Sequence, residues 1–385
     1  MSHEKLSDRE TTRREARPRV DAERFALACE AAVAGGALYL LSYLLSYHNL
    51  NAVWGNYFIA MSEHPFRSGS PFEYRYLVPL LGWITGLRGH SYQTLSIAGG
   101  ALFCVLVYAW SRRFYRSRSI ALLLTLCLAF LSPIEFNHVA PNRSDIFCYL
   151  WLLSAMMWPR YAPAFVFLGL SSHEFFAIYI PFLYLYMFCF SYDATYRTRR
   201  LRMRALIGLA AALSAYAAVR WAIAEANEFS VRYSLSFYWN LISTDIAAEW
   251  QTQPILLGVL VSLKVFWVVL VLAALRLART PPRNWAFLAL LVMPAAGAFT
   301  LLLIAHDTSR FLGHAFVFVL LLPYALPRSR VWLPIVFALN TLIPSFYVGA
   351  DWFVPCNRYA NIFAPWMKTL FYGGDKYLPY WNRHD

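Results

Sequence analysis

Charged side chains are concentrated in a few short clusters that interrupt long apolar runs, and most clusters combine acids with bases. The first contains Glu63, Glu73 and Arg75, and the last is the segment HDTSR at 306–310. A carboxylate next to a substrate hydroxyl can act as a general base. An arginine can hold a phosphate through two parallel hydrogen bonds. These residue types therefore suit proton abstraction from a hydroxyl next to a bound phosphate.

The candidate site draws on all of these clusters. The general-base candidates are Glu63, Glu73 and Asp307. The substrate-binding candidates are Arg75, Arg143, Asp145, His173, Glu174, His306 and Arg310. The segment SSHEFF is not the zinc motif HExxH, because the second histidine is missing after Glu174. The sequence leaves open whether a metal is bound.

Each cluster also has a structural interpretation. The first cluster can lie on the solvated face of an amphipathic helix at a membrane surface. Asp145 or Ser144 can cap the helix that follows them. Glu174 can be a neutral carboxyl bonded to His173 or to the backbone, since an ionised carboxylate costs about 2.5–3.5 kcal/mol or more at a bilayer centre. The HDTSR turn can be closed by a local ion pair between its own acid and base.

The composition places these clusters in a membrane protein. The chain is 59% hydrophobic and 14% charged, and its mean hydropathy is +0.44. The net charge of +13 arises from basic residues that lie between apolar runs, which favours membrane topology over nucleic-acid binding. The six cysteines are scattered, without a CxxC pair, and are expected to be packed thiols.

Apolar runs that can cross a bilayer, or nearly so, set the predicted elements. They are 25–47, 93–111, 119–136, 145–158, 162–191, 204–224, 253–278, 284–305, 311–326 and 331–349. Clusters of Arg follow alternate runs, and the positive-inside rule assigns them to the cytoplasm together with the N-terminal tail. This assignment requires 162–191 to turn back near Ser171–Glu174. It also makes 75–88 a short re-entrant or interfacial helix.

The predicted fold is an all-α, polytopic transmembrane bundle of about eleven helices, with its N-terminus in and its C-terminus out. Residues 1–24 form a charged cytoplasmic tail that leads into an uncleaved signal anchor. Residues 25–349 form the bundle, with a long outer loop at 48–92, and residues 350–385 form an outer aromatic tail. All the candidate clusters then lie on the outer side.

Four segments resemble the GT-C superfamily of polytopic membrane glycosyltransferases. They are PFEYRYLVPLL, PNRSD before a helix, GLSSHEFF, and HDTSR. The resemblance implies an enzyme of the inner (plasma) membrane whose active side faces the periplasm or exterior. It would transfer a sugar from a polyprenyl-phosphate donor to a glycan, lipid or protein acceptor. Arg75, Arg143 and Arg310 would bind the phosphate, and Glu63, Glu73 or Asp307 would take the proton. Some members of the superfamily use a divalent cation such as Mg or Mn.

One departure keeps other functions open. The superfamily usually has an acidic residue soon after the first helix, whereas this chain has His48, Asn51 and Asn56. A non-catalytic scaffold of a surface-polysaccharide assembly is therefore one alternative. A transporter or flippase of a lipid-linked or small polar substrate is another, because Lys264 and Glu30 lie within apolar runs, where ionisable residues commonly mark a pathway. The sugar and the acceptor are not identified by the sequence.

Overall fold

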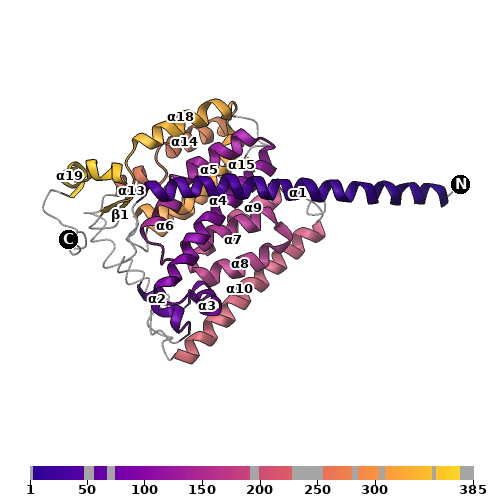
Figure 1. Ribbon diagram of the computed structural model, residues 1–385, viewed down its shortest axis with the longest axis horizontal. Coiled ribbons are helices and arrows are strands. Elements are labelled where there is room, and N and C mark those ends of the chain that lie inside the picture. Colours follow the sequence, from indigo (N-terminus) through magenta and orange to yellow (C-terminus); the bar gives the residue numbers. More distant parts are fainter. Residues whose placement is uncertain are drawn as a thin grey trace.

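The computed structural model describes residues 3–46, 56–66, 74–190, 199–227, 255–279, 285–302, 308–348 and 353–372. This part of the chain is nearly all-α, as predicted (Figure 1). The exception is an antiparallel pair of short strands, β1 (Phe346–Val348) and β2 (Phe353–Pro355), which the all-α prediction did not include. Helix α1 crosses the bundle, and its N-terminal part projects beyond it (Figure 1).

The helices follow the apolar runs closely. In chain order they are α1 (His3–Leu45), α2 (Asn56–Glu63), α3 (Leu77–Thr85), α4 (Gln93–Tyr115), α5 (Arg118–Ala129), α6 (Ser132–Val139), α7 (Asp145–Met157), α8 (Ala162–Ser172), α9 (Tyr179–Phe190), α10 (Arg199–Asn227), α13 (Ile255–Leu263), α14 (Phe266–Ala278), α15 (Trp285–Leu301), α16 (Thr308–Gly313), α17 (Val317–Ala325), α18 (Ser329–Leu342) and α19 (Arg358–Tyr372). Short 3-10 helices are η2 (Gly89–Tyr92), η3 (Pro159–Tyr161), η4 (Glu174–Ile178) and η8 (His314–Phe316).

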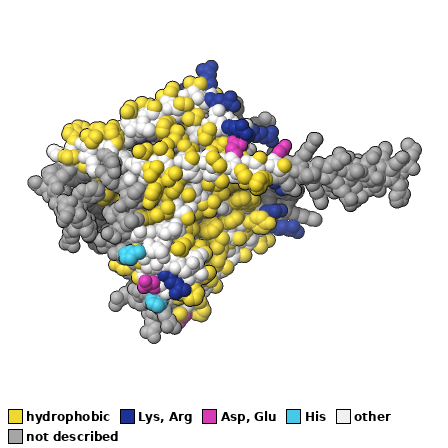
Figure 2. All heavy atoms as spheres, in the orientation of Figure 1, with side chains coloured by type: hydrophobic (Ala, Val, Ile, Leu, Met, Phe, Trp, Pro, Cys, Tyr) yellow, Lys and Arg dark blue, Asp and Glu magenta, His cyan; other side chains and the backbone are white. Residues whose placement is uncertain are grey.

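Several helices have the length and polarity of membrane spans. Within the described residues, four helices are long and apolar enough to cross a membrane, and the number rises to six if each of two bent helix pairs is one span. The count of about eleven stays a prediction. Hydrophobic side chains cover much of the face shown in Figure 2, and Lys and Arg gather near the point where α1 leaves the bundle. Such a wide exposed apolar surface is typical of contact with lipid.

Helix ends that precede or follow the Arg clusters contact one another in the described part of the chain. Arg330 donates a hydrogen bond to the Ser117 hydroxyl at 3.4 Å, and the rings of Phe190 and Phe287 both pack on Tyr324. These contacts join helix ends next to four of the Arg clusters. Clustering at one end is the arrangement that the positive-inside rule requires of turns on the same side.

Three predicted runs are interrupted in ways that the hydropathy pattern did not indicate. The run 253–278 breaks at Lys264, where α13 and α14 meet at 82°, and the run 119–136 breaks between α5 and α6 at 44°. Pro133 stands in the first turn of α6, a position that suits proline because no helical donor is lost there. The run 331–349 ends at Leu342, since Pro344 keeps the preceding residue extended.

Other predicted features agree with the structure. The segment 75–88 contains only the nine-residue helix α3, which ends at Gly86 in the left-handed conformation and is too short to cross a bilayer. The run 162–191 breaks at His173, whose backbone is extended. The predicted domain boundaries stay predictions: helix α1 runs through residue 24, and residue 350 lies outside the described residues.

Two consecutive glycines on α1 give a matched test of its packing on α4. A Cβ at Gly35 would lie 2.6 Å from the Val105 Cα, whereas a Cβ at Gly36 meets nothing within 4 Å. Small residues allow helix backbones to approach closely in membranes. We expect Gly35→Ala to destabilise the fold by about 1–3 kcal/mol and Gly36→Ala to be neutral or slightly stabilising. Melting temperatures in detergent check this, and equal values for both variants would contradict the packing.

Candidate functional site

Arg75 and Glu174 form the first of two bidentate ion pairs. The Arg75 Nε donates to Glu174 Oε2 at 2.8 Å, and Nη2 donates to Oε1 at 2.5 Å. Arg75 precedes α3 and is buried, and Glu174 begins η4 with about a fifth of its side chain exposed. Two parallel bonds fix the plane of the guanidinium group. This pair favours an ionised Glu174 over the neutral carboxyl that the sequence offered as an alternative, because the arginine charge stabilises the carboxylate.

Asp145 and Arg310 form the second pair. The Arg310 Nε donates to Asp145 Oδ1 at 2.9 Å, and Nη2 donates to Oδ2 at 3.0 Å. Both side chains are buried. Neither Asp145 nor Ser144 acts as the predicted helix cap, since Ser144 Oγ donates instead to the carbonyl of Ser172 at 3.0 Å. Tertiary partners thus use both side chains that the local pattern assigned to capping.

His173 lies between the two ion pairs, in the break between α8 and η4. Its Nδ1 is 3.4 Å from Glu174 Oε2, and its Nε2 is 3.3 Å from Arg310 Nη2. Burial between two arginines disfavours a further positive charge on this ring. In one tautomer Nδ1 accepts from the Phe175 N–H at 3.2 Å, and in the other Nε2 accepts from Arg310.

His314 and Tyr179 extend the network beyond Asp145. The His314 Nε2 is 3.5 Å from Asp145 Oδ1, and its Nδ1 is 2.9 Å from the Tyr179 hydroxyl. That hydroxyl also donates to the His314 carbonyl at 2.9 Å. Sequence reasoning missed both residues. The signal for His314 was available, because an ionisable residue inside the apolar run 311–326 is unusual in a membrane helix.

Arg143 reaches the same region through an aromatic ring. The guanidinium carbons of Arg143 and Arg310 lie 5.6 Å and 5.5 Å from the centre of the Phe136 ring. Such contacts are cation–π interactions. Arg143 is held in place by its carbonyl, which accepts a hydrogen bond from Ser96 Oγ at 3.0 Å. We define the charged network as Arg75, Arg143, Asp145, His173, Glu174, Arg310 and His314.

The remaining predicted site residues are not part of this network in the described chain. Glu63 is exposed at the end of α2 and lies next to Gly89. Glu73, His306 and Asp307 lie outside the described residues. Among the residues that are described, no group of three or more His, Cys, Asp or Glu is arranged to hold a metal ion.

The charged network is chemically a set of positioned cations. In Asp145 and in Glu174, both carboxylate oxygens accept hydrogen bonds from one arginine. Each carboxylate is therefore a poor proton acceptor but a good positioning group. The arginines, fixed in this way, suit recognition of an anionic oxygen group. Asp145 and Glu174 are therefore positioning groups for these arginines rather than general bases.

A second polar cluster connects the two bent helix pairs. Lys264 Nζ donates to Ser345 Oγ at 2.7 Å and to the Phe130 carbonyl at 3.3 Å, and it lies 3.9 Å from Glu135 Oε1. Ser345 Oγ in turn donates to Glu135 Oε1 at 2.6 Å. Lys264 therefore pairs within the protein. The pair joins the α13–α14 break to the α5–α6 break.

Comparison with known proteins gives no relative from which to transfer a function. No protein-family model, curated protein or solved structure matches the chain. The interpretation of the site depends on its own residues and geometry.

Proposed function

We propose that the chain is a membrane glycosyltransferase that moves a sugar from a polyprenyl-phosphate donor to an acceptor on the outer (periplasmic or lumenal) side. The observation that supports this is the convergence of the four GT-C-like segments. Arg75, Asp145, Glu174 and Arg310 each come from a different one of these segments, and His173 links the two resulting ion pairs. A shared substrate would explain why four separate segments place their charged residues together.

The proposal gives each part of the site a role. Arg75, Arg143 and Arg310 bind the phosphate that leaves with the prenyl chain, which lies in lipid. Asp145 and Glu174 position two of these arginines rather than accept protons. The acceptor hydroxyl then loses its proton to Glu63, Glu73 or Asp307. Direct displacement would invert the anomeric carbon.

Sugar transfer in nanodiscs tests the proposal. Polyprenyl-phosphate donors that carry radiolabelled hexose or pentose are supplied, and label transferred to acceptors is counted. The variants Arg75→Lys, Glu73→Gln and Asp307→Asn are each compared with the wild type. We expect Arg75→Lys to transfer sugar at least about 100-fold more slowly, because the bidentate geometry is lost. Arg88→Lys is the control, since Arg88 is exposed and stacks on Trp83. Wild-type rates in all three site variants would contradict the proposal.

A transporter is the second candidate, and one observation favours it. The two bent helix pairs meet at the buried Lys264–Ser345–Glu135 cluster, and transporters commonly build substrate sites where helices are broken. Uptake of a lipid-linked sugar into proteoliposomes distinguishes the two. Loss of uptake in Lys264→Met with unchanged sugar transfer would support transport. Absence of both activities in the wild type would favour a scaffold of a surface-polysaccharide assembly.

A further inference from the structure

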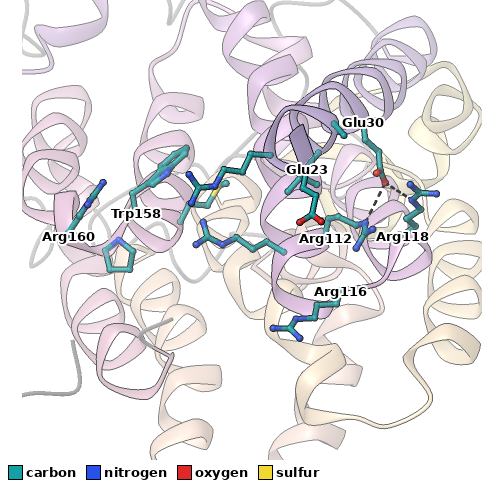
Figure 3. Close-up of a pocket in the computed structure, with 13 residues that line it drawn as sticks. Glu23, Glu30, Arg112, Arg116, Arg118, Trp158 and Arg160 are labelled. Carbon is teal, nitrogen blue, oxygen red and sulfur yellow. Dashed lines mark ion pairs between the residues drawn. The ribbon is translucent and has the colours of Figure 1, made fainter. Parts of the chain in front are cut away.

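A basic pocket of about 960 Å³ opens where α1, the α4–α5 turn and the α7–α8 turn meet (Figure 3). Asp145 begins α7 and Met157 ends it beside this pocket. At 1.5 Å per residue, α7 separates the pocket from the charged network by about 20 Å. The arginines that line the pocket are Arg24, Arg112, Arg113, Arg116, Arg118 and Arg160.

Acidic residues do not balance this charge. The only carboxylates among the described lining residues are Glu23 and Glu30. Glu30 accepts a hydrogen bond from the Tyr108 hydroxyl at 2.5 Å and pairs with Arg118 at 3.1 Å and Arg112 at 3.5 Å. Figure 3 shows Glu30 on one side of the pocket between these two arginines, with Arg160 on the far side. The pocket therefore keeps a net positive charge, which attracts anions.

The rim of the pocket has the composition of a membrane interface. Trp158 lines it and is 39% exposed, and Tyr161, 51% exposed, lies under the Arg160 guanidinium at 4.8 Å. Trp and Tyr gather at the level of lipid headgroups. On α1, Phe25 is 72% exposed, and Leu27 lines the pocket. A charged cavity thus opens beside an apolar surface, the combination expected of a site at the level of lipid headgroups.

We propose that this pocket binds the phosphate of an anionic phospholipid from the surrounding leaflet. Several arginines from three chain segments can form charge-assisted bonds to one phosphate, and basic pockets at the cytoplasmic ends of membrane helices suit lipid headgroups. The acyl chains would follow the exposed face of α1. The bound lipid then clamps α1 to α4 and to the α7–α8 turn, so it stabilises the packing of the first helix. This role is independent of the proposed sugar transfer.

Lipid binding to the purified chain tests the inference. Phosphatidylglycerol or phosphatidylcholine is added in detergent, bound lipid is counted by native mass spectrometry, and the melting temperature is measured. We expect phosphatidylglycerol to bind at least tenfold more tightly than phosphatidylcholine and to raise the melting temperature. The double variant Arg116→Gln, Arg160→Gln removes two exposed charges from the pocket. It should lose at least tenfold in phosphatidylglycerol affinity and most of the thermal shift.

The matched control is Arg276→Gln, Arg279→Gln, which removes two exposed arginines from the end of α14, outside the pocket. It should bind phosphatidylglycerol like the wild type. Equal losses of phosphatidylglycerol affinity in both double variants would indicate general attraction to the basic surface and would overturn the proposed lipid site. In a separate experiment, inorganic phosphate or glycerol 3-phosphate is added instead of lipid. A thermal shift from either one at the concentration at which phosphatidylglycerol acts would assign the pocket to a soluble phosphate instead.

Discussion

Replacement of Arg310 by Met is expected to destabilise the folded chain by about 3–5 kcal/mol, because it leaves the Asp145 carboxylate buried without its partner. Both side chains are buried, and Arg310 donates to each of the two Asp145 oxygens. Its loss also removes the contact with His173 at 3.3 Å. The melting temperature in detergent, followed by size-exclusion chromatography, measures the effect. Arg88→Met is the control, since Arg88 is exposed.

The double variant Asp145→Leu, Arg310→Met distinguishes a structural pair from a functional one. Apolar residues of similar volume often replace a buried ion pair at little cost, so most of the stability should return. Donor binding should not return, because the proposed phosphate site has lost an arginine. If single and double variants are equally unstable, the Asp145 charge is not the cause. If the double variant binds donor normally, Arg310 has no part in binding.

The approximate positions of several helices could be predicted from sequence, because long apolar runs mark them. An apolar run of fixed length is the physical requirement for a span, and it is visible in the sequence without knowledge of any neighbour. The cost of an ionised group in apolar surroundings also selected Glu174 as unusual. The free-energy cost of burying a charge identifies which residues need partners, but it does not identify the partners.

The two ion pairs could not be predicted from the sequence, because each one joins distant segments. Arg75 and Glu174 are 99 residues apart, and Asp145 and Arg310 are 165 residues apart. Local patterns offered nearer partners, a helix cap for Asp145 and an ion pair within HDTSR for Arg310. A bidentate charge-assisted pair is stronger than either local interaction in a buried setting. The packing of α7 in the bundle brings Asp145 to Arg310, and this contact between distant segments is not visible in the sequence.

The helix break at Lys264 shows a second limit of hydropathy. Lys264 is the only charged residue in the middle of the run 253–278, and Arg276 stands near its end, so the average hydropathy of the run describes a single span. The backbone of Lys264 is left-handed, with φ at +52°, a conformation that costs a residue with a side chain about 1 kcal/mol or more. The α5–α6 break supplies the compensation, because it exposes the Phe130 carbonyl that Lys264 binds. The hydrogen bond between Lys264 and Phe130 thus links the two helix breaks.

Replacement of Lys264 by Met is the second large effect, with an expected loss of about 3–5 kcal/mol in folding free energy. Met keeps the unbranched stem and the same backbone cost at this position, so the change isolates the ammonium group. Without it, Glu135 keeps, among the described residues, the bond from Ser345 at 2.6 Å, and the Phe130 carbonyl that follows α5 loses the bond from Lys264. Melting temperatures of the single variant and the wild type measure the loss.

Two further variants separate the contributions of charge and backbone. Glu135→Met together with Lys264→Met removes both charges and should recover most of the stability, as expected for an isolated buried pair. Lys264→Gly relieves the left-handed backbone but removes the same ammonium group, so it should remain less stable than the wild type. If Lys264→Gly is instead as stable as the wild type, the lysine contributes nothing beyond its backbone conformation. The junction of the two bent helix pairs would then be maintained by apolar packing and by the bond from the Val265 N–H to Asn340 Oδ1 at 2.9 Å.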